Sequence, residues 1–205
     1  MVATAGISSR RDGNIWTEGT AMTTSSSPPS RIGGAAEHPD DPLLADMFAQ
    51  IRASRGHLLN IHRVGGLAPK LLRAQATYTR AMREDAAVPR DLQELVILRV
   101  AQVNGSDYEQ SVHRPIALAC GVSQPKIDAL AAWQQSSLYS ARERAALGFA
   151  EQAGSGGEVD DAVFTTLRQV FSVQEIVELA AIVSWYVGNS RFVRALRIVS
   201  ETERA

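Results

Sequence analysis

The chain has 205 residues, of which 45% are hydrophobic and 21% are charged. These proportions are those of an ordinary globular protein with enough residues for one real core. Its formal net charge of -1 gives no electrostatic reason to expect nucleic acid or an anionic membrane as a partner. Cys120 is the only cysteine, which excludes an internal disulfide, a CxxC redox pair and a thiolate metal cluster.

Residues 1 to about 40 differ in composition from the rest of the chain. They are rich in serine, threonine, proline and glycine and show little apolar periodicity, so they cannot bury enough surface to offset the entropy of ordering. We therefore expect a disordered tail over 1–40, in which only Trp16 is suited to docking, and a helical domain over 41–205. No apolar run suits a secretory signal or a membrane span, so we expect a cytoplasmic protein.

From Pro42 onwards, apolar residues recur at three- and four-residue spacing, which is the period of helices packed on one face. The stretch Leu92–Val103 follows a proline suited to a first helical turn and is apolar on nearly every side, as in a helix buried in a domain centre or against another subunit. The other expected helices cover about 43–51, 68–83, 106–120, 141–153, 160–171, 173–187 and 190–199, with one more beginning near 123. No period-two run with hairpin turns occurs, so the expected fold class is all-α.

The helix expected over 106–120 carries the residues with the clearest potential for chemistry. Glu109 and His113 are four residues apart and share a helical face with the apolar Val112 and Ile116. Burying such groups unpaired costs roughly 2–7 kcal/mol each, so they need polar partners. A carboxylate bonded to a histidine fixes its tautomer and raises its basicity, which makes a general acid/base unit. A structural pair that joins two helices is equally compatible with the spacing.

The stretch from Leu92 to Gly121 resembles the carboxymuconolactone decarboxylase superfamily, which includes the AhpD-type alkylhydroperoxidases. The resembling residues are Leu92-Gln93-Glu94-Leu95-Val96-Ile97-Leu98-Arg99-Val100-Ala101-Gln102-Val103-Asn104-Gly105, then Ser106-Asp107-Tyr108-Glu109, His113, Ala117 and Gly121. Shorter similarities at 60–63, 69–72 and 185–189 extend the resemblance over about 43–200. It implies an AhpD-like helical bundle.

In the peroxidase branch of this superfamily, two cysteines stand seven and four residues before the histidine, where this chain has Ser106 and Glu109. A serine cannot undergo disulfide chemistry, so the resemblance does not imply peroxidase activity. The decarboxylase branch also lacks the cysteines and has a glutamate four residues before a histidine. The resemblance therefore implies a cofactor-independent lyase in which His113 moves a proton to or from carbon, Glu109 orients it, and Glu94 relays the proton or pairs with the histidine.

The same resemblance implies a small organic acid, lactone or enolisable carbonyl compound as substrate, with decarboxylation, lactone opening or isomerisation as the reaction. Arg99 is a candidate to hold a substrate carboxylate, with a purely structural pairing as its alternative. The other candidate substrate-binding residues are His62, Ser106, Tyr108, Tyr186 and Asn189. No two histidines share metal-ligand spacing on one helix, so neither a metal site nor a cofactor is expected.

Two alternatives stay open at this point. A specialised biosynthetic cyclase or dehydratase would use the same pocket, whereas a non-catalytic ligand-binding or assembly protein would bury the pair without a cavity beside it. We expect the lone Cys120 to be a small buried apolar residue at a helix end. Helices that are apolar on all sides predict a homo-oligomer, and the resemblance implies a trimer or hexamer. We expect no nucleic acid and no membrane among the partners.

Overall fold

The computed structural model describes residues 29–156 and 158–201, and within them it contains helices and no strand. The all-α fold expected from the sequence is therefore confirmed. The docking role expected of Trp16 falls outside the described residues. The helices, in chain order, are α1 (Pro42–Arg55), α2 (Asn60–Gly65), α3 (Pro69–Arg83), α4 (Arg90–Val103), α5 (Asp107–Ala119), α6 (Gln124–Ala129), the 3-10 helix η1 (Leu130–Gln135), α7 (Ala141–Gly154), α8 (Asp161–Val170) and α9 (Val173–Leu196).

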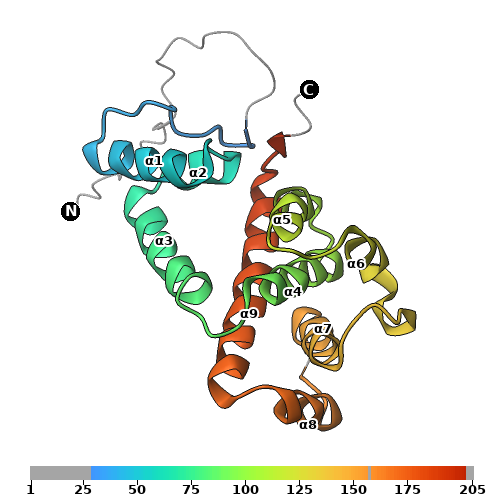
Figure 1. The fold of residues 1–205 in the computed structure, drawn as a ribbon. Coiled ribbons are helices and arrows are strands. Elements are labelled where there is room, and N and C mark those ends of the chain that lie inside the picture. Colours follow the sequence, from blue (N-terminus) through green and yellow to red (C-terminus); the bar gives the residue numbers. More distant parts are fainter. Residues whose placement is uncertain (1–28, 157, 202–205) are drawn as a thin grey trace, which may run out of the picture.

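Helices α4 to α9 form a bundle around two central helices, α4 and the long α9 (Figure 1). Helix α4 packs against α5, α7 and α9, and its Leu95, Val96 and Ile97 are at most 1% exposed. The apolar stretch Leu92–Val103, which is part of α4, therefore lies in the centre of this bundle. No helix among residues 29–156 and 158–201 is long and apolar enough to cross a membrane.

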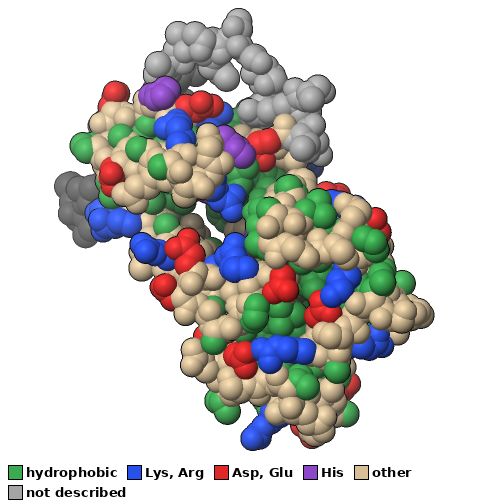
Figure 2. Space-filling view, in the orientation of Figure 1, with side chains coloured by type: hydrophobic (Ala, Val, Ile, Leu, Met, Phe, Trp, Pro, Cys, Tyr) green, Lys and Arg blue, Asp and Glu red, His purple; other side chains and the backbone are tan. Residues whose placement is uncertain are grey.

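Helices α1, α2 and α3 form a separate layer on one side of the bundle, which we call the arm (Figure 1). The arm has a small core of its own, in which Phe48 of α1 is fully buried and packs with Leu72 of α3. One contact between the arm and α9 is the ring pair of Tyr78 and Trp185, whose centroids are 5.3 Å apart. Figure 2 shows a hollow between the arm and the bundle, bordered by basic side chains.

Residues 29–40 belong to the tail expected from the sequence and contain no helix. Their backbone is nevertheless bonded to both layers of the molecule. The Ala35 amide donates to the Arg63 carbonyl of α2 at 2.8 Å, and the Arg31 amide donates to the Leu196 carbonyl of α9 at 2.9 Å. This segment therefore connects the arm to the end of α9.

Helix α9 runs without interruption through residues 188 and 189, where the sequence predicted a break between two helices. A glycine in a helix interior costs about 1 kcal/mol relative to alanine. Burial of the flanking Tyr186 and Val193 against the bundle offsets that cost. The short α2 was not predicted, because six residues are too few to establish a helical period.

Candidate active site

The start of α5 places Glu109 and His113 on its inner face. Ser106 is the N-cap residue, and its hydroxyl accepts a hydrogen bond from the Glu109 amide at 3.4 Å. Such a cap satisfies one of the free amides of a first turn and sets the direction of the helix. Glu109 and His113, one turn apart, are 2% and 4% exposed. The expectation that both residues lie on the buried face is met.

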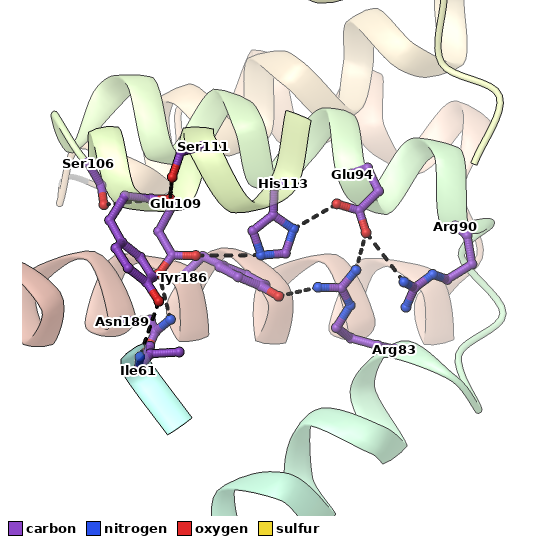
Figure 3. A network of polar contacts seen from close by, with 11 residues as sticks. Ile61, Arg83, Arg90, Glu94, Ser106, Glu109, Ser111, His113, Tyr186 and Asn189 are labelled. Atoms are coloured by element: carbon purple, nitrogen blue, oxygen red, sulfur yellow. Dashed lines mark hydrogen bonds and ion pairs between the residues drawn. The ribbon is translucent and has the colours of Figure 1, made fainter. Parts of the chain in front are cut away.

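The Nδ1 atom of His113 is hydrogen-bonded to Glu94 of α4, with 2.8 Å between Nδ1 and Oε2 (Figure 3). The other oxygen of Glu94 accepts from the guanidinium of Arg83 and, at 3.4 Å, from that of Arg90. Burial alone would raise the pKa of Glu94, but the hydrogen bond with His113 and the two arginine charges together hold it below its ordinary value. Glu94 is therefore an ionised, fully buried carboxylate that only accepts hydrogen bonds.

The ionised state of Glu94 determines the tautomer of His113. Because Glu94 only accepts, Nδ1 carries the proton and donates it. Burial lowers the pKa of His113, and the hydrogen bond with Glu94 offsets this only in part. The imidazole is thus neutral, and the lone pair on Nε2 is free to accept a proton.

Glu109 lies on the other side of the imidazole, with its Oε2 3.5 Å from Nε2 of His113. Its Oε1 accepts a hydrogen bond of 2.7 Å from the Asn189 amide of α9 (Figure 3). Burial raises the pKa of Glu109 to about 7, against the opposing effects of this hydrogen bond and of the Arg83 and Arg55 charges. Since Oε1 is occupied by Asn189, the proton of the neutral acid belongs on Oε2, which faces Nε2.

Arg83 joins the arm to this network. It is the last residue of α3, is only 8% exposed, and also donates to the Tyr186 hydroxyl of α9. The Tyr186 ring meets the His113 ring edge-on, with centroids 5.0 Å apart. No residue spacing around Glu94 or His113 indicates Arg83, because Arg83 comes from another helix. Arg90 could be predicted as a partner of Glu94, because it stands four residues before Glu94 on the same helix.

Arg99 has structural partners and no bond to the network. Its guanidinium binds Gln102 of its own helix at 3.1 Å and Glu151 of α7 at 3.0 Å. Of the two roles considered for Arg99, this pairing favours the structural one. Cys120 is half-buried at the end of α5, not fully buried as expected.

Three other candidate residues bond to backbone groups around the site. Ser106 caps α5, as described above. The Tyr108 hydroxyl accepts from the Ile61 amide at 3.2 Å, and Nδ1 of His62 accepts from the Leu59 amide at 3.1 Å. Burial, with smaller effects of the Arg55 and His57 charges, lowers the pKa of His62 to about 4. These side chains hold α2 and α5 in place beside the network.

Two cavities among the described residues can be compared with the site, and neither is lined by Glu109 or His113. One, of about 320 Å³, lies where the start of α5 meets the end of α9 and includes Ser106 and Arg197 in its lining. The other, of about 290 Å³, lies near Pro89 and Lys126. Among residues 29–156 and 158–201, no three histidine, cysteine or carboxylate side chains are grouped to hold a metal ion.

Residues 69–152, which include Glu94, Glu109 and His113, match the model of the carboxymuconolactone decarboxylase family. Over this stretch the chain is therefore similar to the carboxymuconolactone decarboxylase family. The chain is 26% identical over 117 residues to the uncharacterized protein YdfG of Bacillus subtilis, across 56% of this chain and 77% of YdfG. It is 39% identical over 80 residues to the uncharacterized protein YnjA of Escherichia coli, across 38% of this chain and less than half, 44%, of YnjA.

Solved structures share the fold of this chain. An uncharacterized peroxidase-related protein with an AhpD core from Ralstonia eutropha JMP134 has a TM-score of 0.76 at 21% identity, over 87% of this chain and 95% of that one. The debrominase Bmp8 is 26% identical, and a variant of it in complex with 2,3,4-tribromopyrrole has a TM-score of 0.72 over 89% of this chain and 94% of Bmp8. The AhpD-like fold is thus confirmed, and an enzyme uses the same scaffold.

Proposed function

We propose that this chain is a cofactor-independent acid/base enzyme that moves a proton to or from a carbon atom of a small organic acid, lactone or enolisable carbonyl compound. The observation that carries the proposal is the pair of atoms Glu109 Oε2 and His113 Nε2, 3.5 Å apart and buried, with the other histidine nitrogen held by ionised Glu94. A base with a free lone pair and an acid that titrates near neutrality are the two groups such chemistry requires.

The geometry supports a simple exchange of protons. Nε2 of His113 takes a proton from the carbon next to a carbonyl group, and Glu94 stabilises the imidazolium that forms. The electron pair of the broken C–H bond moves to the carbonyl oxygen and gives an enolate. Glu109 then donates its Oε2 proton to a carbon of the enolate, and the imidazolium returns a proton to Glu109. In decarboxylation no proton is taken from carbon: Glu109 protonates the enolate that remains after carbon dioxide leaves, and a proton from water then restores the neutral Glu109.

Proton exchange at carbon in D2O tests this proposal. We would incubate the full chain with acetylacetone and, separately, with carboxymuconolactone, and follow the loss of C–H signals and of the carboxyl group by NMR. The expected result is a rate above the protein-free rate for at least one compound, reduced by about 10²-fold or more in Glu109→Gln and His113→Gln. Asp107→Asn makes the same carboxyl-to-amide change at an exposed position of α5 and should keep the wild-type rate. Equal rates with and without protein, or with and without Glu109, would contradict the proposal.

A non-catalytic role is the second candidate, and one observation favours it. Glu109 and His113 are nearly fully buried, being 2% and 4% exposed, and neither lines either cavity described above. If the pair is only structural, Glu109→Gln and His113→Gln change the free energy of unfolding while the wild type accelerates no C–H exchange. A specialised cyclase or dehydratase would instead show the same dependence on both residues with a larger substrate.

A further inference from the structure

The hydrogen-bonding capacity of Arg83 is not filled within the network. Its two terminal nitrogens donate to Tyr186 and Glu94, whereas its Nε, which is buried, has no partner among the described residues. A buried N–H group of a charged side chain that lacks an acceptor is costly, and such groups in native proteins call for a specific explanation. An acceptor supplied by a bound ligand is such an explanation.

Tyr186 presents a second unused donor beside the first. Its hydroxyl oxygen accepts from Arg83, and within the described part of the chain no acceptor is in place for its own proton. Burial raises the pKa of Tyr186, so the hydroxyl keeps this proton at neutral pH. The Tyr186 ring also contacts His113, so the residue that carries this free donor packs against the proposed base.

The charges around the proposed base are mostly positive. Glu94 is the one ionised carboxylate bonded to the network near neutral pH, and it is bonded by both Arg83 and Arg90. Arg55, an exposed residue at the end of α1, acts electrostatically on Glu109 from the arm. Figure 2 shows basic side chains around the hollow between the arm and the bundle. A recess with an excess of one sign of charge attracts and holds ligands of the opposite sign.

We propose that Arg83 and Tyr186 form an oxyanion-binding pair, and that the substrate is a small planar molecule whose negative charge lies or develops on an oxygen atom, as in an enolate or a phenolate. This inference rests on the proposed function, because it names the substrate class of the same site. When Nε2 of His113 takes the proton from carbon, the electron pair moves to the carbonyl oxygen. The Tyr186 hydroxyl then donates a hydrogen bond to that oxygen, and the adjacent Arg83 guanidinium stabilises its negative charge.

Binding of 4-nitrophenol to the full chain tests the pair without any turnover. At about pH 6, where free 4-nitrophenol is mostly protonated, the wild type should bind the ionised form and increase its visible absorption. The neutral analogue 4-nitroanisole has nearly the same shape and serves as the reference ligand. Tyr186→Phe and Arg83→Lys should each weaken nitrophenolate binding about 10-fold or more and leave binding of 4-nitroanisole unchanged. Arg83→Lys keeps the charge beside Glu94, which favours a folded variant.

Two matched variants serve as controls for these substitutions. Tyr108→Phe removes the hydroxyl of another buried tyrosine, which accepts from a backbone amide, and Arg99→Lys alters another largely buried arginine, paired with Glu151. Both should bind nitrophenolate as the wild type does. No binding by the wild type, equal binding by Tyr186→Phe and Arg83→Lys, or preference for 4-nitroanisole would overturn the oxyanion pair.

The binding and exchange experiments separate the two proposals. If nitrophenolate binding fails while C–H exchange still depends on Glu109, the proposed function stands and the oxyanion pair is wrong. If nitrophenolate binding depends on Arg83 and Tyr186 while exchange does not depend on Glu109, the oxyanion pair stands and the proposed acid/base role fails.

Discussion

The two ends of the buried network hold the same kind of side chain in opposite electrostatic surroundings. Glu94, at one end, is fully buried and bonded by two arginines and by His113. Glu109, at the other end, is equally buried, but its hydrogen-bond donor is the neutral amide of Asn189. The pKa of Glu94 therefore falls below its ordinary value, whereas that of Glu109 rises to about 7.

This difference separates the roles of two carboxyl groups that flank one imidazole. Burial is common to both, so it cannot explain the contrast by itself. The arginines at the Glu94 end keep that carboxylate ionised, and it fixes the histidine tautomer. The absence of a bonded cation at the Glu109 end leaves a carboxyl group that gains and loses a proton near neutral pH. Pairs of titratable groups pushed apart in this way are typical of acid/base sites.

The contrast between the two carboxyl groups is tested first at the Glu94 end, by removing one of its arginines. Arg83→Met leaves Glu94 with Arg90, which is 42% exposed and 3.4 Å away. Removing one partner of a buried ion pair costs about 3–5 kcal/mol of unfolding free energy. Chemical denaturation measures this loss. Arg114→Met removes an arginine from an exposed pair with Asp128 and should cost less than about 1 kcal/mol. Similar costs for the two variants would show that the Glu94 end is not a stabilising ion pair.

The pH dependence of the unfolding free energy tests the Glu109 end of the network. The pKa of Glu109 is about 7 in the folded chain against an ordinary value of 4.5, so the folded state binds this proton more tightly than the unfolded state. The contribution of Glu109 to stability is therefore fully present below pH 4.5 and is lost as the pH rises through 7. The loss amounts to about 3 kcal/mol at most.

The difference in unfolding free energy between wild type and Glu109→Gln isolates this effect. This difference should fall as the pH rises from 4.5 through 7. The lowered pKa of His113 has the opposite effect on stability, because the contribution of His113 is lost as the pH falls. The corresponding difference for Asp107→Asn should vary little across the same range. A flat difference for Glu109→Gln would mean that Glu109 titrates as an ordinary glutamate.

The smallest expected effect concerns a single hydrogen bond, the one that the Asn189 amide donates to Glu109. The Asn189 amide favours the ionised form of Glu109, so Asn189→Leu should raise the pKa of Glu109 further. The pH range over which stability is lost should then extend upward, and the loss of unfolding free energy at pH 8 should be larger by about 1 kcal/mol or more. The same denaturation series measures it. Asn104→Leu removes an amide that donates to two carbonyl groups, and should leave that range in place. An unchanged range in Asn189→Leu would contradict the role given to this bond.

The sequence predicted those features that depend on neighbours along one helix. The buried face that carries Glu109 and His113 and the burial of α4 both follow from helical periodicity, which is a local property. Arg99 lies five residues beyond Glu94 on α4, a spacing that turns it toward Glu151 of α7. That contact depends on which helices are neighbours, and spacing along one helix does not supply this information.

The roles within the site could not be predicted for the same reason. Spacing along α5 suggested Glu109 as the group that orients His113, whereas Nδ1 of His113 is held by Glu94, nineteen residues earlier on another helix. Arg83 reaches the network from the arm, so no motif links it to either carboxylate. The pKa values depend on burial and on these distant charges together, and both arise only when the arm and the bundle pack together.

A carbon-13 NMR titration of the full chain labelled at the glutamate carboxyl groups tests the central contrast most directly. Glu94→Gln and Glu109→Gln assign the two resonances by their disappearance. We expect the Glu109 carboxyl to titrate near pH 7 and the Glu94 carboxyl to stay ionised below pH 4.5. A Glu94 carboxyl that titrates near neutrality, or a Glu109 carboxyl that is ionised throughout the range from about pH 5 to 8, would contradict the division of roles between them.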